Sequence, residues 1–464
     1  MRPTRRRVVG SLCAALAAPA LLAGWRRRPG LAFAGPLPAG SAYRRYLNVW
    51  SRYLSGAPVD DREALALLEH PQSFAERRET FPEAGAFGVF TSCTPHRDVF
   101  FDCLDFGLRW LTAPDNPDPA LPPLHDRGQL YSWQWSFWGR AALELYEATG
   151  EPRFLDLLVG AAHNVLAARD DRHGIVDGNQ KRVVKSWGSV ISFGGPPMRG
   201  TDITATGLIA LPILQLANRL GARGELDEEI AGLALDCAPG FDEYETFYVD
   251  LPRFDAGCYR YAFIPQAIDP TNHMNAFGAG LVELYAFTRE ARHLERARKL
   301  LNFYRNSMVT DDDGAISTPY EQDPDFRKRP RSEWFWKMTV SAELPLALAR
   351  HGLLVKEEEM IGIARTYADV VMARPDGINA MTRRSDRPRI IDFTKPLDSE
   401  TPEYRSYVPM IAAGLFFVDR EPRIGHKLLR YMLHHPQWFA NGLFGGGGAA
   451  LLARAYSLRR GLRL

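Results

Sequence analysis

Apolar residues recur at spacings of three and four along most of the chain, and the pattern comes in pairs of segments joined by short turns. In the two clearest pairs, Leu143-Glu-Leu-Tyr146 matches Val282-Glu-Leu-Tyr285. The match continues through a second amphipathic segment to an acidic turn that ends in Gly174 or Gly314. This spacing places apolar side chains on one face of a helix. Each copy is therefore predicted to be a hairpin of two helices.

Weaker copies repeat the same order of an apolar helix, a turn and a charged helix. They cover Ile203 to Leu220 with Leu226 to Cys237, Trp334 to His351 with Glu357 to Ala373, and Tyr404 to Val418 with Ile424 to His434. A last helix over Ala449 to Arg459 would pair with an N-terminal one such as Ala42 to Leu54. The first helix of each pair is apolar nearly all round and the second is charged on one face, which indicates an inner and an outer layer. We expect an all-α fold, an (α/α)6 toroid with minor strands in its loops.

The N-terminal ends of the inner helices should converge on one mouth of this toroid, and they are rich in aromatic and polar residues. Sugars present apolar C–H faces and polar edges, so such a mouth suits a saccharide. We expect these residues to contact the substrate: Trp133, Trp135, Asn272, Trp334, Arg405 and Tyr407.

Two sets of acid and base residues are compatible with this mouth. Asp202 and Glu333 would suit glycoside hydrolysis, which uses one carboxyl group as acid and another as base or nucleophile. Tyr259, Tyr261 or His273 would instead remove the proton beside a uronate carboxylate in a lyase or epimerase. Asn272 or Arg405 would then hold the developing charge. Both sets lie on the same predicted rim, and both alternatives stay open.

The same residues also have structural explanations. Asp202 follows Gly200 and Thr201 at a helix start, where its side chain can cap free N–H groups. Glu333 suits the first turn of a helix, whose dipole favours an acid there. The tryptophans at positions 133 to 138 can pack the hairpin core, and His273 can be a buried structural histidine.

The first 34 residues are predicted to be an export signal. Arg5, Arg6 and Arg7 precede an Ala- and Leu-rich stretch, which is typical of twin-arginine export, and Ala32-Phe33-Ala34 is a cleavage motif. Three further arginines at 26–28 are also compatible with a retained membrane anchor. We expect a single domain over residues 35–464, export machinery as a partner, and a periplasmic or extracellular location that includes possible retention at the membrane.

Removal of this segment takes seven arginines and no acid, so the formal charge falls from +2 to −5. An acidic protein is a poor binder of nucleic acid. The remaining cysteines form two sequence-local pairs, and in an oxidising compartment we expect Cys93 to bond Cys103 and Cys237 to bond Cys258. No second ligand pair at zinc spacing accompanies Cys93 and His96, so we expect neither a metal nor another cofactor.

The stretch from Trp138 to Asp156, WGRAALELYEATGEPRFLD, resembles the hairpin signature of the six-hairpin glycosidase-like superfamily, and Asn275 to Tyr285 repeats it. Cys258 to Tyr261 with the following helix is similar, more loosely, to the C-terminal domain of D-glucuronyl epimerases. The resemblance implies an (α/α) toroid that hydrolyses, eliminates or epimerises glycans. The segment Ser332 to Met338 lacks the histidine that often begins an inner helix in such toroids.

The resulting hypothesis is an exported carbohydrate-active enzyme, similar to glycoside hydrolases, whose partner is a poly- or oligosaccharide. A uronate lyase or epimerase is the first alternative. The second is a protein without enzymatic activity that binds glycans or assists exopolysaccharide assembly, since it could use the same aromatic mouth. An acid and a base that both reach one sugar distinguish an enzyme from a binder.

Overall fold

The computed structural model describes residues 104–435, with gaps at 106, 110, 116–120, 192–196, 328–331 and 397–398, and also residues 438, 452, 455 and 456. Several expectations lie outside the described residues. These are the export segment 1–34, the helix at 42–54, the Cys93–Cys103 disulfide and most of the last helix at 449–459.

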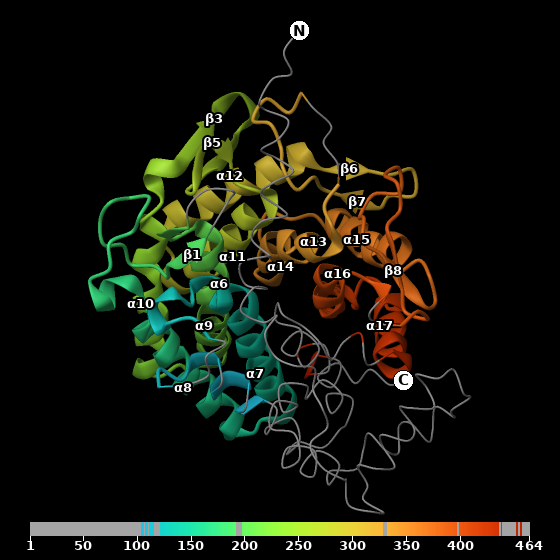
Figure 1. Cartoon of the computed structure of the whole chain (residues 1–464). Helices are drawn as coiled ribbons and strands as arrows, with labels where there is room; N and C mark the ends of the chain where they lie inside the picture. Colours follow the sequence, from blue (N-terminus) through green and yellow to red (C-terminus); the bar gives the residue numbers. More distant parts are fainter. Residues whose placement is uncertain are drawn as a thin grey trace, which may run out of the picture.

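Five helical hairpins follow one another around a common centre in the described part of the chain (Figure 1). The pairs, inner helix first, are α7 (Ser136–Thr149) with α8 (Pro152–Ala167), α9 (Ile203–Arg223) with α10 (Glu228–Asp242), α11 (Thr271–Thr288) with α12 (Ala291–Ser307), α13 (Phe335–Ser341) and α14 (Glu343–Arg350) with α15 (Glu357–Arg365) and the π-helix η7 (Thr366–Val371), and α16 (Pro402–Tyr407) and the 3-10 helix η9 (Val408–Phe417) with α17 (Arg423–His434). The predicted fold class, an all-α toroid of helical hairpins, is confirmed.

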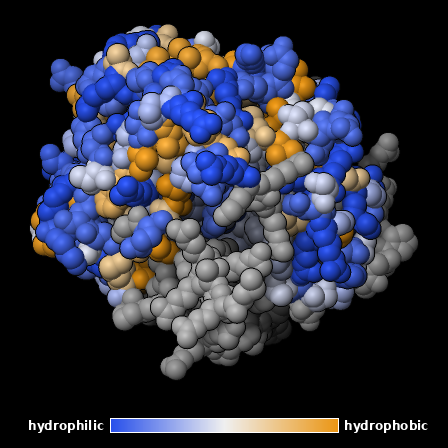
Figure 2. Space-filling model, turned by 90° about the horizontal axis from the view of Figure 1, so that it is seen from above, coloured by the Kyte–Doolittle hydropathy of each residue, from blue (hydrophilic) through white to orange (hydrophobic). Residues whose placement is uncertain are grey.

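The inner helices pack side by side: α9 contacts α7 and α11, α11 contacts α13 and α14, and α13 contacts η9. The approach of α9 to α11 depends on Gly207, because a Cβ atom there would lie 2.5 Å from the carbonyl oxygen of Ala276. Helix α9 is long and apolar enough to cross a membrane, yet protein encloses most of it. The charged faces of the outer helices give a largely hydrophilic surface with small hydrophobic groups between (Figure 2).

Short antiparallel sheets lie in the connections that run from each outer helix to the next inner helix. They are β1 (Ser189–Ile191) with β2 (Met198–Gly200), β3 (Tyr248–Leu251) with β4 (Ala256–Tyr261) and β5 (Ile264–Ile268), β6 (Val309–Thr310) with β7 (Ile316–Ser317), and β8 (Gly377–Asn379) with β9 (Ile390–Asp392). Single turns of helix accompany them: η2 (Leu124–Asp126), α6 (Gly128–Leu130), the π-turn η3 (Tyr131–Trp135), η4 (Asp170–His173), η5 (Glu245–Phe247) and η6 (Pro252–Phe254).

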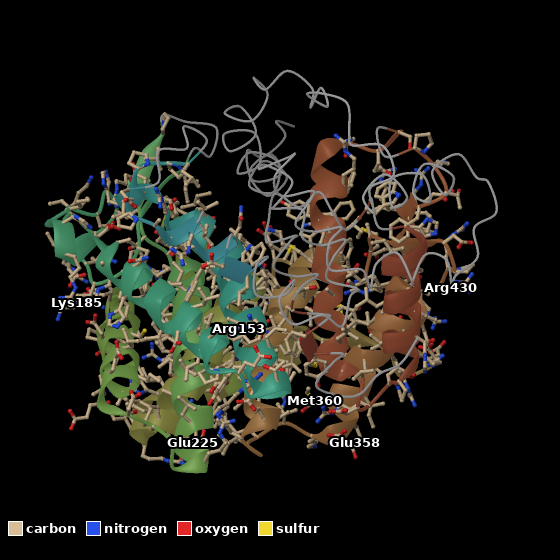
Figure 3. All side chains as sticks on the ribbon, turned by 90° about the horizontal axis from the view of Figure 1, so that it is seen from below. Arg153, Lys185, Glu225, Glu358, Met360 and Arg430 are labelled. Atoms are coloured by element: carbon tan, nitrogen blue, oxygen red, sulfur yellow. The ribbon has the colours of Figure 1, made fainter. Side chains whose placement is uncertain are left out.

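This topology makes the two ends of the ring different. The long connections with strands all lead into the N-terminal ends of inner helices, whereas the turns within each hairpin are short. Glu225 and Glu358, which flank two of these short turns, lie along one edge of the molecule in Figure 3. The N-terminal mouth therefore carries most of the loop residues from which a site can be built.

The inner helix of the fourth hairpin is interrupted at Ala342, where the sequence predicted one continuous helix. Pro345 lacks the N–H that would bond the carbonyl of Ser341. The side chain of Asn275 on α11 donates to that carbonyl at 2.6 Å instead. This hydrogen bond, made possible by the break, connects α11 to α13.

The predicted disulfide between Cys237 and Cys258 is wrong. Both thiols are free and buried, Cys237 on α10 and Cys258 on β4. Burial raises the pKa of each thiol to about 12, so both behave as small apolar core residues. The two cysteines are close in sequence but lie in different elements, and each side chain is buried there without forming a disulfide.

Candidate functional site

The first component of the candidate site is Asp202, the N-cap of α9. Its backbone is extended while the chain enters the helix, and its Oδ1 accepts a hydrogen bond from the N–H of Ala205 at 2.7 Å. The preceding Thr201 is fixed by Asp177, whose Oδ2 accepts from both the N–H and the hydroxyl of Thr201. The capping role considered from the sequence is therefore present. It occupies only one of the two carboxylate oxygens.

The second oxygen of Asp202 faces a polar and aromatic group on the turn before α7. Gln129 Nε2 donates to Asp202 Oδ2 at 3.0 Å, and Trp133 Nε1 donates to Gln129 Oε1 at 2.9 Å. Lys337 on α13 lies above the Trp133 ring, with Nζ 5.4 Å from its centroid, and 5.0 Å from that of Tyr320. The N-terminal ends of α9 and α13 and the turn that leads into α7 therefore meet at this mouth.

A second carboxyl group, Asp269, lies just before α11. His273 Nδ1 is 2.7 Å from Asp269 Oδ1, and the two residues are one helical turn apart. The ring of Tyr261, at the end of β4, lies 5.7 Å from the imidazole. The β4–β5 hairpin therefore brings Tyr261 to the His273 predicted from the sequence.

Burial shifts the pKa of both carboxyl groups and of the imidazole. Burial raises the pKa of Asp202 to about 6. Burial also holds the pKa of Asp269 well above its usual value, and the nearby charge of Asp202 adds to that shift. For His273 burial lowers the pKa well below its usual value, and the charge of Lys337 contributes in the same direction. Near neutral pH, Asp202 is mostly ionised, whereas burial favours the uncharged forms of Asp269 and His273.

Several buried polar atoms at this mouth have no hydrogen-bond partner within the described part of the chain. They include Oδ2 of Asp269, both polar side-chain atoms of Asn272, and the hydroxyls of Thr204 and Thr271. Buried polar groups in native proteins nearly always have a partner. A cluster of unmet donors and acceptors, concentrated at the starts of α9 and α11, indicates a place for a ligand with many hydroxyl groups or for water.

Glu333, the other carboxyl predicted from the sequence, faces different neighbours. Its two oxygens accept hydrogen bonds from Thr318 at 2.8 Å and Ser341 at 2.6 Å, and the residue is fully buried. Burial raises the pKa of Glu333 to about 8, and the charge of Lys337 opposes that shift. Burial raises the pKa of Tyr304 on the outer helix α12, and the charge of Glu333 adds to that shift.

The predicted aromatic residues of the last two inner helices form one stack. The rings of Trp334 and Trp336 are 4.9 Å apart at 16°, and those of Trp336 and Tyr407 are 4.6 Å apart at 6°. Tyr404 packs against both tryptophans. Trp334 is half-buried, so part of this aromatic wall is accessible, and Arg405 is also half-buried beside it on α16.

Trp135 lies away from the mouth. Its ring is fully buried, and its Nε1 donates to the carbonyl of Ile209 on α9 at 2.9 Å. Residues two apart on a helix point in nearly opposite directions, so Trp133 and Trp135 do not share a face. The structure thus brings together Trp133, Asp202, Tyr261 and His273, and places Trp135 and Glu333 in the packing layers.

Sequence reasoning missed Asp269 and Gln129 as site residues. Asp269 precedes an inner helix by two positions, much as Asp202 directly precedes another. An alignment of helix starts would have shown an acid at both. Gln129 carried no such signal, because its role depends on a contact with Asp202 from a turn 73 residues away.

No protein-family model matches the chain, and no curated protein matches it. The structure is similar to GH76A alpha-1,6-mannanase of Salegentibacter sp. HEL1_6, at 11% identity and a TM-score of 0.46, over 78% of this chain and 98% of that one. An inactive variant of that mannanase in complex with alpha-1,6-mannotriose gives a TM-score of 0.47 at 10% identity, with the same coverage. At this identity a shared substrate does not follow from a similar chain path. The similarity to D-glucuronyl epimerases stays a prediction.

Proposed function

We propose that the protein is a carbohydrate-active enzyme that cleaves glycosidic bonds at the N-terminal mouth of the ring. One observation carries the proposal. Two buried carboxyl groups, Asp202 and Asp269, precede neighbouring inner helices, and the charge of one raises the pKa of the other. Pairs of carboxyl groups whose environments separate their pKa values are how glycosidases divide acid and base roles.

The environments assign the roles. Asp269, whose pKa burial and then the charge of Asp202 raise well above its usual value, is the general acid: its proton passes from Oδ2 to the glycosidic oxygen as the bond from that oxygen to the sugar breaks. His273 holds Oδ1 and so orients the group. Asp202 stays ionised because its hydrogen bonds from Ala205 and Gln129 offset part of its burial. It takes the proton of the attacking water, or attacks the sugar carbon itself.

The surrounding side chains supply the binding. Trp133 offers an aromatic surface beside Asp202, and the half-buried Trp334 offers another on the wall of α13. Asn272 can both donate to and accept from sugar hydroxyls, since its amide is buried with no partner among the described residues. This combination of aromatic faces and unmet polar groups fits a sugar better than an apolar ligand.

A second candidate function is proton abstraction from a uronate, as in a lyase or epimerase. The observation that favours it is the Asp269–His273 pair, which would fix the imidazole with Nε2 as the base, in the way that a buried acid orients a catalytic histidine. Lys337, whose charge reaches His273, would stabilise the developing negative charge. Tyr261 lies beside the imidazole and would supply the second proton of an epimerisation.

The test is incubation of the purified mature protein with a panel of neutral and uronate-containing polysaccharides. New reducing ends without unsaturated products support hydrolysis. Unsaturated products, or an inverted uronate, support the second candidate. Turnover of none of these polymers, combined with tight binding of one, contradicts both and indicates a glycan-binding protein.

We also propose that the mature protein works outside the cytoplasm as a single domain over residues 35–464. The support for this is the sequence alone: paired arginines, an apolar run and the Ala32-Phe33-Ala34 motif. Glycans at the cell surface would be the accessible substrates there.

A further inference from the structure

Gln129, the middle residue of the short helix α6, is hydrogen-bonded at both ends of its side-chain amide. Its Nε2 donates to Oδ2 of Asp202 at 3.0 Å, and its Oε1 accepts from the indole N–H of Trp133 at 2.9 Å. An indole nitrogen can only donate, so the amide oxygen must face Trp133 and the amide nitrogen must face Asp202. Trp133 therefore sets the direction in which Gln129 donates.

The backbone of Gln129 is held by β1, the first strand of the connection that leads to Asp202 (Figure 1). The N–H of Gln129 donates to Ser189 Oγ at 2.6 Å. In the β1–β2 sheet Ser189 pairs with Gly200, two residues before Asp202. The same small sheet thus fixes the positions of Gln129 and of the carboxyl group to which it donates.

The residue before Gln129 allows this close approach. The N–H of Gly128 donates to the carbonyl of Gly188 at 3.1 Å. A Cβ atom on residue 128 would lie 2.5 Å from the carbonyl oxygen of Trp187, so only glycine fits there. The sequence therefore holds α6 against β1 through a backbone contact.

The indole of Trp133 is also fixed. Only 8% of Trp133 is exposed, and Lys337 on α13 holds its Nζ 5.4 Å from the ring centroid, a cation–π contact. Because the ring is enclosed, its N–H cannot turn toward solvent and stays on Gln129. The indole N–H, the Gln129 amide and the Asp202 carboxyl group form a relay of three fixed groups.

The relay ends on the charged form of Asp202. A donor aimed at a carboxylate oxygen stabilises the anion and opposes the effect of burial, and for Asp202 the hydrogen bond from Gln129 acts in that direction. A carboxylate oxygen can accept more than one hydrogen bond, so the contact orients Oδ2 without using its whole capacity.

We propose that Gln129 is the positioning residue of Asp202, and that Trp133 acts on Asp202 through it. The role rests on the proposed function, in which Asp202 is the base or the nucleophile. The relay controls the charge and the direction of that one carboxyl group. Its loss should therefore change the pH at which the enzyme works more than its affinity for the glycan.

The test removes the donors of the relay one at a time. Gln129→Met keeps the size of the side chain and loses both hydrogen bonds, whereas Trp133→Phe keeps an aromatic ring and loses only the N–H. Each variant is unfolded in urea at several pH values beside the same variant carrying Asp202→Asn. The difference in the free energy of unfolding within each pair then follows the Asp202 carboxyl group.

The folded pKa of Asp202 lies above its unfolded value, so this difference falls as the pH rises and levels off above the folded pKa. Loss of the donor raises that pKa further. In Gln129→Met the difference should level off about one pH unit higher than in the wild type, the scale of a hydrogen bond to a charged group. Trp133→Phe should shift it in the same direction by less.

Activity gives a second result. On a glycan that the enzyme turns over, the low-pH limb of kcat should move upward in Gln129→Met while KM changes little, because a base must be ionised to act. If no glycan is turned over, the proposed function fails, and the unfolding experiment still decides whether Gln129 and Trp133 act on Asp202.

Gln215→Met is the matched control. Gln215 is also a buried glutamine, on α9 itself but several turns beyond Asp202, and its replacement should leave the pH dependence unchanged. Should Gln129→Met not fold, Gln129→Glu keeps the oxygen that faces Trp133, loses the donor to Asp202 and should shift the curve upward too.

Two results would overturn the proposal: a Gln129 variant that levels off at the wild-type pH, or an equal shift in Gln215→Met. A Trp133→Phe curve that coincides with the wild type would overturn the part assigned to Trp133.

Discussion

Arg140 and Glu343 connect two inner helices that are not neighbours, with Nη1 and Oε1 2.5 Å apart in the middle of the ring. Replacing Arg140 by Met alone leaves Glu343 as an unpaired buried charge, and we expect it to lower the free energy of unfolding by about 3–5 kcal/mol. The double variant Arg140→Met, Glu343→Leu removes both charges and should recover most of that loss. Urea unfolding measures both. A double variant no more stable than the single one would contradict this account of the pair.

The pKa of Asp202 predicts a pH dependence of stability. Burial raises this pKa from 3.8 to about 6, so the folded protein holds the Asp202 proton more tightly than the unfolded chain does. The resulting stabilisation is complete below pH 4 and is lost as the pH rises to 6. Its upper size is about 3 kcal/mol, from two pKa units.

Asp202→Asn keeps a good helix cap and cannot titrate, so it serves as the reference. The free energy of unfolding of the wild type minus that of the variant should fall between pH 4 and pH 7. A difference that stays constant over this range would show that the Asp202 carboxyl group is not shifted.

The contact of α9 with α11 predicts opposite effects for two glycine replacements. Gly207→Ala places a Cβ atom 2.5 Å from the Ala276 carbonyl oxygen, and we expect a loss of stability of roughly 1–3 kcal/mol from overpacking. Gly232→Ala, on the outer helix α10, meets no atom within 4 Å and should stabilise the protein by about 0.5–1 kcal/mol through helix propensity. Thermal unfolding of both variants gives the comparison, and a neutral Gly207→Ala would mean that the two helices lie further apart.

The export proposal is tested in cells. Replacing Arg5 and Arg6 by Lys should leave the precursor in the cytoplasm, because twin-arginine signals require the paired arginines. Immunoblots of cytoplasmic and exported fractions would show it. Unchanged export of the double variant would rule out the twin-arginine route.

The hairpins could be predicted from the sequence because each one contains a periodic pattern of apolar residues, as the matching Leu143 and Val282 segments show. The breaks were harder. Pro345 leaves the Ser341 carbonyl without its helical partner, but the sequence does not show that the Asn275 side chain donates a hydrogen bond to it, because Asn275 lies on another helix. Irregularities that tertiary contacts stabilise leave little local signal.

The candidate site was predictable in part for the same reason. Asp202, His273 and Trp133 begin or precede inner helices, so topology alone brings them to one mouth. Burial raises the pKa of Asp269, and the charge of Asp202 at the start of another inner helix adds to that shift, a relation that no local pattern shows. Trp135 and Glu333 looked equally favourable in sequence, but helix geometry and the hydroxyls of Thr318 and Ser341 direct them into packing layers.

The assignment of Asp202 and Asp269 as the acid and base pair differs from the pair expected from sequence, Asp202 with Glu333, and the two are separable by experiment. Glu333 has a pKa of about 8 and both of its oxygens are engaged. Glu333→Gln therefore replaces one neutral side chain by another near neutral pH, and we expect turnover within a few-fold of the wild type.

The most direct measurement is the turnover of Asp269→Asn and Glu333→Gln on the best glycan substrate, at pH 7, with folding of both variants checked by circular dichroism. If Asp269 is the general acid, Asp269→Asn lowers kcat by roughly 10² or more, the scale of lost acid catalysis, while Glu333→Gln remains active. The opposite result, an active Asp269→Asn and an inactive Glu333→Gln, would contradict the account and restore the pair expected from the sequence.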